Sequence, residues 1–337
     1  MSGNLMEQDM AEQPAVLTAL AARRDEIMES LAGSAPAGIV IVARGSSDHA
    51  GIFGRYLLEA ATGLPVALAA PSLQTLYGVQ PRVEGWLAIA VSQSGRTPEI
   101  ATVLERFRKA GARAVAVTNE PDSPLARQAA VHIPLGAGEE RAVPATKTFT
   151  AQLAAMALMA EGLGSSQFEA GDWERLPALV KELLADATPA ERAAVQLQNA
   201  DELACVGRGY LMCVALEAAL KLREAAGVRA EGWSAADFRH GPLTVSGPAL
   251  PTLAVSAKGP AAADVAELAE QLAAAGAPVL RMSDDPDVSI PYPGGLAEPL
   301  AAIPATVRAQ QLALALARRR GVDPDRPPGL AKVTPTA

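Results

Sequence analysis

Residues 38–45 read GIVIVARG, and this stretch decides the fold class. A continuous apolar run that ends in glycine is typical of a strand buried on both faces, and a helical pattern follows it from about residue 47 to residue 61. Similar runs recur at 86–92 (WLAIAVS) and 113–119 (RAVAVTN), with the amphipathic stretch PEIATVLERFRKAG between them. Apolar runs that alternate with helices of about 10–15 residues predict an α/β fold with a parallel sheet covered on both faces.

The chain also repeats itself. VARG at 42–45 is echoed by VGRG at 206–209, and AVSQSG at 90–95 is echoed by AVSAKG at 254–259. Both echoes lie 164 residues downstream, and the spacing from Gly45 to Ser92 equals the spacing from Gly209 to Ser256, at 47 residues. Because two separate motifs share one offset, the sequence predicts two tandem copies of a single α/β domain.

These patterns divide the chain into five expected segments: an N-terminal helical segment (1–37), a first domain (38–163), a helical linker (164–200), a second domain (201–320) and a tail (321–337). The linker is rich in charge and has no strand pattern. A last helix is expected at about 300–320, before a proline-rich tail of the kind that is often disordered or wraps an edge. Two domains agree with the length of 337 residues, because single cores rarely grow beyond about 250–300 residues.

Bulk composition excludes several classes of protein. Half of the residues are hydrophobic and 20% are charged, as in globular proteins, and the net charge of −8 argues against nucleic-acid binding. No run approaches the roughly 18–20 apolar residues of a membrane span, and the first residues lack an apolar signal core, so a cytoplasmic location without membrane partners is expected. Cys205 and Cys213 have no His-rich partner segment, which predicts buried free thiols and neither a disulfide nor a metal site.

The run SQSGRT at 92–97 follows a predicted strand and has two interpretations. It can be a polar turn, or it can bind a phosphate through the hydroxyls of Ser92, Ser94 and Thr97 and the amide of Gln93. The second copy reads SAKGPA, which keeps the serine and the glycine but loses the other hydroxyls and the amide. Since fold requirements apply to both copies, the difference favours phosphate binding by the first copy.

A phosphate also suits the predicted position of this run. Ligands of open α/β sheets bind beyond the carboxyl ends of the strands, where helix N-termini present free N–H groups. Ser46 and Ser47, which follow the neighbouring predicted strand, would complete the site. Neither a Walker loop nor a G-x-G-x-x-G fingerprint is present in this run, so the phosphate of a small molecule fits better than a nucleotide.

Six motifs in order carry a family resemblance: ARGSSDHA, SQSGRTPE, VPATKTFTAQ, ALEAALKLRE, DFRHGP and GLAK. Together they resemble the sugar-isomerase (SIS) domain family, and within it the isomerase half of glutamine–fructose-6-phosphate aminotransferases and the stand-alone glucosamine-6-phosphate deaminases. The resemblance runs from about residue 38 to residue 332. It implies two tandem SIS domains, each a flavodoxin-like, three-layer α/β/α sandwich with a parallel sheet. It also implies an enzyme that acts on a sugar phosphate without a metal or redox cofactor.

The resemblance also implies roles for single residues. Glu224 matches the base that moves a proton between C1 and C2, His240 the histidine that assists ring opening, and Lys332 the tail lysine that forms an imine in the synthases. The phosphate ligands match Ser47, Ser92, Gln93, Ser94 and Thr97, while Glu140 and Val143 fall where the family lines the sugar pocket. Pro144 and Ala145 depart from the synthase pattern, which removes one hydroxyl from that pocket.

Spacing gives a weaker signal for the same chemistry. Glu217, Lys221 and Glu224 share one helix face, because they lie four and three residues apart. The group can be a solvated ion pair with a spare carboxylate, or it can be a catalytic carboxylate beside a substrate-binding lysine. His49 is expected to pack or cap a helix, and His132 to lie within a strand.

We therefore expect a homodimer that converts glucosamine 6-phosphate to fructose 6-phosphate and ammonia, with His240 offered across the subunit interface. The residue after Met1 is Ser2 and not a cysteine that processing could expose as a nucleophile, so no glutaminase activity is expected from this chain. The alternatives are a fructosamine-6-phosphate deglycase, an isomerase of another amino-sugar phosphate such as galactosamine 6-phosphate, and a sugar-phosphate sensor without turnover.

Overall fold

The computed structural model describes residues 3–165 and 167–332, which fall into two compact units. We name each unit after the sheet that it contains, which is formed by the first or the second copy of the sequence repeat. The N-sheet unit comprises residues 16–139, 151–165, 167 and 331–332, and the C-sheet unit comprises residues 3–15, 140–150 and 168–330. Each unit is described by itself.

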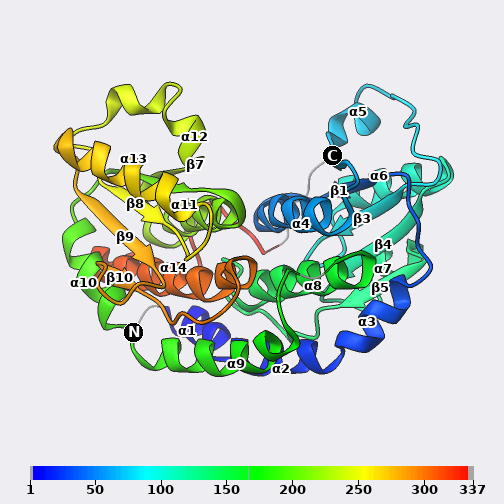
Figure 1. Ribbon diagram of the computed structural model, residues 1–337, viewed down its shortest axis with the longest axis horizontal. Helices are drawn as coiled ribbons and strands as arrows, with labels where there is room; N and C mark the ends of the chain where they lie inside the picture. The colour runs from blue at the N-terminus through cyan, green and yellow to red at the C-terminus, as the bar shows by residue number, and fades with distance from the viewer. Residues whose placement is uncertain (1–2, 166, 333–337) are drawn as a thin grey trace. The chain divides into compact units, whose positions relative to one another are not determined.

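The N-sheet unit is built on five parallel strands in the order β2-β1-β3-β4-β5 (Figure 1). The strands are β1 (Ile39–Val42), β2 (Val66–Leu68), β3 (Leu87–Val91), β4 (Arg113–Thr118) and β5 (Val131–Pro134). The helices are α2 (Gln13–Ala22), which begins in the other unit, α3 (Arg24–Leu31), α4 (Ser46–Thr62), α5 (Pro71–Thr75), α6 (Pro98–Lys109), α7 (Pro124–Gln128) and α8 (Lys147–Leu163), which spans both units. The order is flavodoxin-like, so ligands are expected where the chain switches direction between β1 and β3.

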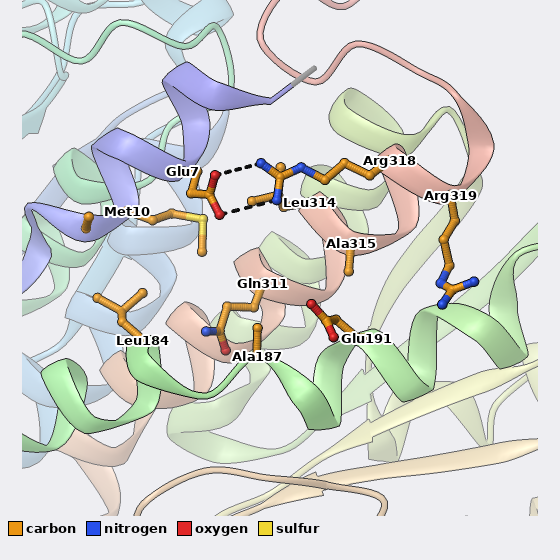
Figure 2. Close-up of a pocket in the computed structure, with 11 residues that line it drawn as sticks. Glu7, Met10, Leu184, Ala187, Glu191, Gln311, Leu314, Ala315, Arg318 and Arg319 are labelled. Atoms are coloured by element: carbon orange, nitrogen blue, oxygen red, sulfur yellow. Dashed lines mark hydrogen bonds and ion pairs between the residues drawn. The ribbon is translucent and has the colours of Figure 1, made fainter. Parts of the chain in front are cut away.

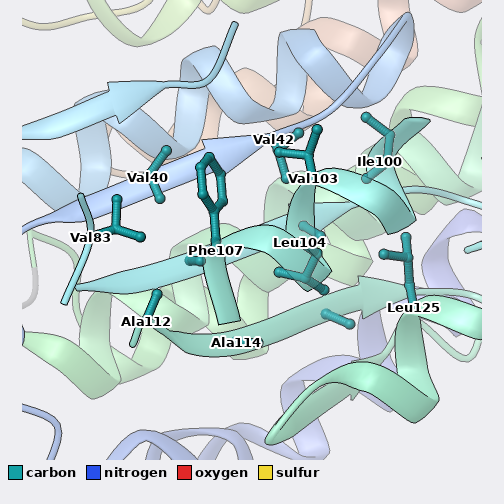
Figure 3. Close-up of a cluster of buried hydrophobic side chains, with 13 residues drawn as sticks. Val40, Val42, Val83, Ile100, Val103, Leu104, Phe107, Ala112, Ala114 and Leu125 are labelled. Atoms are coloured by element: carbon teal, nitrogen blue, oxygen red, sulfur yellow. The ribbon is translucent and has the colours of Figure 1, made fainter. Parts of the chain in front are cut away.

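Both faces of this sheet are buried, which explains the unbroken apolar runs. On one face, alternate residues of β1, β3 and β4 pack against Ile100, Val103, Leu104 and Phe107 of α6 and Leu125 of α7 (Figure 3). On the other face, α4 lies so close to β1 that a Cβ on Gly51 would be 3.2 Å from Cγ2 of Ile41. The result is the three-layer arrangement predicted from the sequence.

The C-sheet unit repeats this topology with five parallel strands in the order β10-β9-β8-β6-β7. The strands are β6 (Glu202–Gly207), β7 (Arg229–Ser234), β8 (Thr252–Val255), β9 (Val279–Ser283) and β10 (Ile290–Pro291). The helices are α1 (Asn4–Ala11), α9 (Ala170–Ala185), α10 (Thr188–Leu197), α11 (Met212–Ala226), α12 (Ala235–Phe238), α13 (Ala262–Ala274) and α14 (Glu298–Arg320), with 3-10 turns η1 (Gly209–Leu211) and η2 (Pro242–Val245).

Strand register confirms the internal repeat. In the first sheet Val40 pairs with Ala88, and in the second Ala204 pairs with Thr252, each residue 164 positions after its counterpart. Helix α13 also begins 164 residues after α6. The expected two-domain α/β fold is therefore present, and the predicted helices near 47–61 and 300–320 are α4 and α14.

The compact units differ in extent from the segments expected from the sequence. Helix α1 and the helices α9 and α10, which fall in the expected N-terminal and linker segments, belong to the C-sheet unit. Much of the tail is also held in that unit: the Asp325 carboxylate accepts hydrogen bonds from the N–H groups of Leu5 and Met6, at 3.1 and 2.9 Å. This carboxylate caps the N-terminus of α1, so the described tail is tied to the core.

Helix α14 is long and apolar enough to cross a membrane by length and composition alone. Within its most apolar window, however, 94% of the residues are buried inside the protein. Helix α14 is thus the core helix of the C-sheet unit.

Candidate phosphate and proton-transfer sites

Two loops at the carboxyl edge of the first sheet carry the predicted phosphate ligands. Ser46 and Ser47 begin α4 after β1, while Ser92, Gln93 and Ser94 follow β3. Ser47 and Ser92 are buried, and the other three side chains are half-buried. The loops therefore flank the switch point of the sheet, which is where the sequence placed them.

Three of these hydroxyl oxygens already accept a hydrogen bond from the protein. The N–H of Gly95 donates to Oγ of Ser92 at 3.2 Å, and the N–H of Arg96 donates to Oγ of Ser94 at 3.3 Å. The side-chain amide of Gln152 donates to Oγ of Ser47 at 3.0 Å. The Ser92 hydroxyl also lies 3.5 Å from that of Thr97, and either oxygen can be the donor of that contact. Because a hydroxyl that accepts from the protein can still donate its own proton, this arrangement suits an anion.

Gly95 is required at the centre of the loop after β3. Its φ is +59°, and a Cβ there would lie 2.2 Å from Oγ of Ser123. Only glycine fits this left-handed turn against its neighbour. The glycine therefore sets the path of the loop, and the hydroxyls around it remain available for a ligand.

An ion pair joins the two loops, and sequence reasoning missed it. Arg44, between β1 and α4, forms two hydrogen bonds with the buried Glu99 of α6, at 2.9 and 3.1 Å. Both residues lie within motifs quoted above, ARGSSDHA and SQSGRTPE, but nothing in the sequence indicated that they would meet. The pair holds the loop after β1 against the helix that follows β3.

In the second sheet, one carboxylate, that of Glu298, lies beside the matching loops. A Cβ on Gly259 would lie 2.2 Å from Oε2 of Glu298, and one on Gly209 would lie 4.0 Å from Oε1. In the first copy, a Cβ on Gly45, the counterpart of Gly209, would meet nothing within 4 Å. A Cβ on Gly95, the counterpart of Gly259, would lie nearest to the Ser123 hydroxyl and not to a carboxylate. Burial, and then the charge of Asp284, raises the pKa of Glu298. A second anion is therefore disfavoured at this switch point.

Helix α11 brings Glu217, Lys221 and Glu224 together. The Lys221 ammonium lies 3.3 Å from Oε1 of Glu217 and 2.5 Å from Oε2 of Glu224. The side chains of Glu217 and Lys221 are each 1% exposed, whereas that of Glu224 is 20% exposed. The interpretation of these residues as a solvated surface pair is wrong, because only Glu224 reaches solvent.

The charge state of Lys221 is decided by the two carboxylates and not by burial. Burial by itself lowers the pKa of Lys221, but the carboxylates of Glu217 and Glu224 outweigh it and raise the pKa above its ordinary value. Lys221 is thus a fixed cation at neutral pH. It balances one of two carboxylates, and the half-buried Glu224 is the carboxylate that a substrate can reach.

His240 and Lys332 lie on other parts of the chain. His240 follows α12. Its backbone N–H donates to the carbonyl of Asp237 at 2.9 Å, and its side chain is exposed. Lys332 is half-buried and is the last residue that the structure describes. The roles that the family resemblance implies for them remain predictions.

Glu140 lies beside the N-terminus of α8. Its Oε1 accepts hydrogen bonds from the N–H and hydroxyl of Thr146, at 2.7 and 3.0 Å, and Thr148 donates to both oxygens. Val143 is held by its N–H, which donates to the carbonyl of Asp325 at 3.2 Å. The Glu140 carboxylate thus holds the start of α8 through hydrogen bonds. Direct contact of Glu140 or Val143 with a sugar remains a prediction.

Residues expected to be structural are so placed. Cys205 and Cys213 are free and buried, and His132 lies in β5, where its Nε2 is 2.9 Å from the Thr118 hydroxyl. His49 lies in α4. Within residues 3–165 and 167–332, no group of three or more His, Cys, Asp or Glu residues could hold a metal ion.

The C-sheet unit also contains a hollow of about 500 Å³ (Figure 2). Helices α1, α10 and α14 contribute to its lining, and Glu7 and Arg318 pair at its rim, at 2.7 Å. None of the predicted site residues lines it. We therefore assign it no part in the proposed chemistry.

Comparison with known proteins decides the family. The SIS domain model matches residues 35–162 and 196–291, more than half of the chain. The chain belongs to the SIS domain family. Its curated relatives include glutamine–fructose-6-phosphate aminotransferases of Zymomonas mobilis, 32% identical over 311 residues, and Pyrococcus horikoshii, 34% identical over 307. Each match covers 87% of this chain and 51% of the relative, so this SIS chain spans about half the length of these proteins.

Solved structures agree with this assignment. A candidate phosphosugar isomerase of Silicibacter pomeroyi is 31% identical, with a TM-score of 0.84 over 96% of this chain and 100% of that one. The glucosamine-6-phosphate deaminase of Thermotoga maritima is 22% identical, with a TM-score of 0.77 over 95% of this chain and 99% of that one. The latter likeness shows the shared SIS fold alone.

Proposed function

We propose that this chain is an amino-sugar-phosphate isomerase that releases ammonia, converting glucosamine 6-phosphate to fructose 6-phosphate. The contrast between the two copies carries the proposal. In the first copy, Ser47, Ser92 and Ser94 are arranged to donate to an anion, whereas in the second copy Glu298 fills the matching position. A sugar phosphate bound by the first copy accounts for both observations.

The proposed chemistry uses Glu224 as the proton carrier. After ring opening assisted by His240, Glu224 removes the proton from C2 of the open-chain sugar while O1 gains a proton, which gives an enolamine. Glu224 then returns its proton to C1 while the amine nitrogen loses one. The product is an imine at C2, which water hydrolyses to the ketose and ammonia. Two observations support this role: the Glu224 carboxylate is held 2.5 Å from the Lys221 ammonium, and its side chain is 20% exposed, so a substrate can reach it.

An assay of released ammonia and free amino acid across three substrate classes tests the proposal. The substrates are glucosamine 6-phosphate, galactosamine 6-phosphate and glycated amino acids phosphorylated at C6. We expect ammonia from glucosamine 6-phosphate and a loss of about 10²–10⁴-fold in kcat for Glu224→Gln. Glu270→Gln, the same change at an exposed carboxylate of α13, is the matched control and should keep full activity.

Other outcomes of this assay point to different functions. Ammonia from galactosamine 6-phosphate alone would reassign the sugar, and free amino acid from a glycated substrate would indicate a deglycase. Binding without any turnover would indicate a sensor. Unchanged release by Glu224→Gln would assign the proton transfer to another base.

We also propose that the enzyme is a cytoplasmic homodimer in which His240 acts on the substrate of the partner subunit. The exposed position of His240 after α12 and the family resemblance support this arrangement. Mixed dimers of Glu224→Gln and His240→Asn chains should regain activity, because one of the two sites then contains both intact residues. A 34.6 kDa monomer in sedimentation, or no recovery on mixing, would contradict it.

A further inference from the structure

Gln152 occupies a buried position that packing alone does not explain. It is 1% exposed, and its side-chain amide donates to Oγ of Ser47 at 3.0 Å, while its Oε1 has no hydrogen-bond partner in the described part of the chain. A buried polar atom without a partner costs stability, so an apolar side chain of the same size would suit a purely structural position better. Its amide donor is therefore the feature to be explained.

Helix packing holds this amide in a defined place. Helices α4 and α8 lie side by side in the same direction: a Cβ on Gly54 would lie 2.7 Å from Sδ of Met156, and Ser165 after α8 donates to the carbonyl of Ala61, at 3.0 Å. Gln152 lies one helical turn before Met156, and Ser47 two turns before Gly54. The contact between Gln152 and Ser47 thus belongs to a helix pair that is fixed along its length.

We propose that Gln152 is a positioning residue that directs the Ser47 hydroxyl proton toward the phosphate. The amide N–H occupies one lone pair of the Ser47 oxygen, so the hydroxyl acts as a donor to a bound anion. Ser92 and Ser94 are set in the same way by backbone N–H groups of their own loop, but Ser47 relies on a side chain from another helix. The proposal rests on phosphate binding by this loop, as proposed above.

Binding of inorganic phosphate to the full chain, followed by 31P line broadening, tests this role without any turnover. Ser47→Ala should weaken binding about tenfold, because it removes a hydrogen bond to a charged group. Gln152→Met keeps the size and burial but removes the donor, and should weaken binding about fivefold. Gln152→Glu should weaken it further, because a carboxylate accepts the Ser47 proton and repels the anion.

A double-mutant cycle separates positioning from a general structural effect. In the Ser47→Ala background, Gln152→Met should have no further effect on phosphate binding, since the hydroxyl that it orients is gone. The matched control is Gln128→Met, which should bind phosphate as the parent does. Gln128 lies in the same unit, and its buried Oε1 also has no hydrogen-bond partner among the described residues. Circular dichroism of each variant establishes that it is folded.

The outcomes distinguish this inference from the proposed function. Normal binding by Gln152→Met, or an effect of Gln152→Met that persists in the Ser47→Ala background, overturns the role of Gln152 alone. Normal binding by Ser47→Ala overturns the phosphate site and with it the inference. If the cycle behaves as expected but no amino-sugar phosphate is turned over, the proposed reaction is wrong and the positioning role stands.

Discussion

Replacing Lys221 by methionine should destabilise the C-sheet unit by about 3–5 kcal/mol, the usual cost of removing one partner from a buried ion pair. The magnitude follows from the surroundings of the ammonium, which lies 3.3 Å from Glu217 and 2.5 Å from Glu224 with 1% of its side chain exposed. Without it, the Glu217 carboxylate loses its counter-ion in a site that is 1% exposed. Urea unfolding followed by circular dichroism measures the loss.

The loss should depend on pH with a definite sign. In Lys221→Met the pKa of Glu217 in the folded state should rise above its unfolded value, because burial then acts without the opposing ammonium. A raised acid pKa gives stability that is present below the unfolded pKa and is lost as the pH rises through the folded pKa. The deficit of the variant should therefore be larger at pH 8 than at pH 5, and adding Glu217→Gln should recover most of it.

Lys109→Met provides a control at the same spacing. Lys109 and Glu105 form an i,i+4 pair at 2.8 Å, shorter than the 3.3 Å between Lys221 and Glu217, but both side chains are exposed. If burial decides the energy, Lys109→Met should leave the unfolding transition unchanged. A loss below about 1 kcal/mol for Lys221→Met, or no recovery by Glu217→Gln, would refute the assignment of a buried charge cluster.

Three further predictions concern the loop after β3, the tail and the thiols. Gly95→Ala should lower the free energy of unfolding by about 1–3 kcal/mol because of its positive φ, should add a clash with Ser123, and should weaken phosphate binding. The control is Gly63→Ala, at φ +67° with open space around it, which should show the conformational cost alone and leave phosphate binding intact. Asp325→Ala should lower the unfolding free energy by about 1 kcal/mol, because the N–H groups of Leu5 and Met6 lose their hydrogen-bond acceptor. An unchanged melting temperature would show that the tail does not hold α1. Cys205 and Cys213 should not react with an aromatic disulfide reagent at pH 8 until the protein unfolds. Both thiols are fully buried, and burial raises the pKa of both. Rapid labelling of the folded protein would contradict their placement.

Local patterns were sufficient to predict the fold. The runs at 38–45, 86–92 and 113–119 became β1, β3 and β4, because strands buried on both faces must be apolar throughout. The offset of 164 residues between motifs is also the offset between the registers of the two sheets. The domain limits were less predictable, since the sequences of α1, α9 and α10 carry no signal for the unit to which they belong.

The predicted site was only partly defined by sequence. The motifs located the loops with Ser47 and Ser92, because hydroxyl-rich turns after buried strands carry a chemical signature. The pairing of Arg44 with Glu99, the contact of Gln152 with Ser47 and the carboxylate of Glu298 in the second copy had no such signature. Each depends on two segments distant in the chain that meet only after packing.

Sequence alone therefore determined the α/β class, the duplication and the residue types available for phosphate binding and proton transfer, because each follows from local composition, periodicity and motif spacing. Tertiary structure alone decided which oxygens can still donate a proton and which charges are buried. Lys221 illustrates the division: its spacing from Glu217 and Glu224 placed it on one helix face, but only the packed chain buries that face, where the two carboxylates keep Lys221 charged against the effect of burial. Solvent exposure sets the strength of a charge interaction, and exposure is a property of the packed chain.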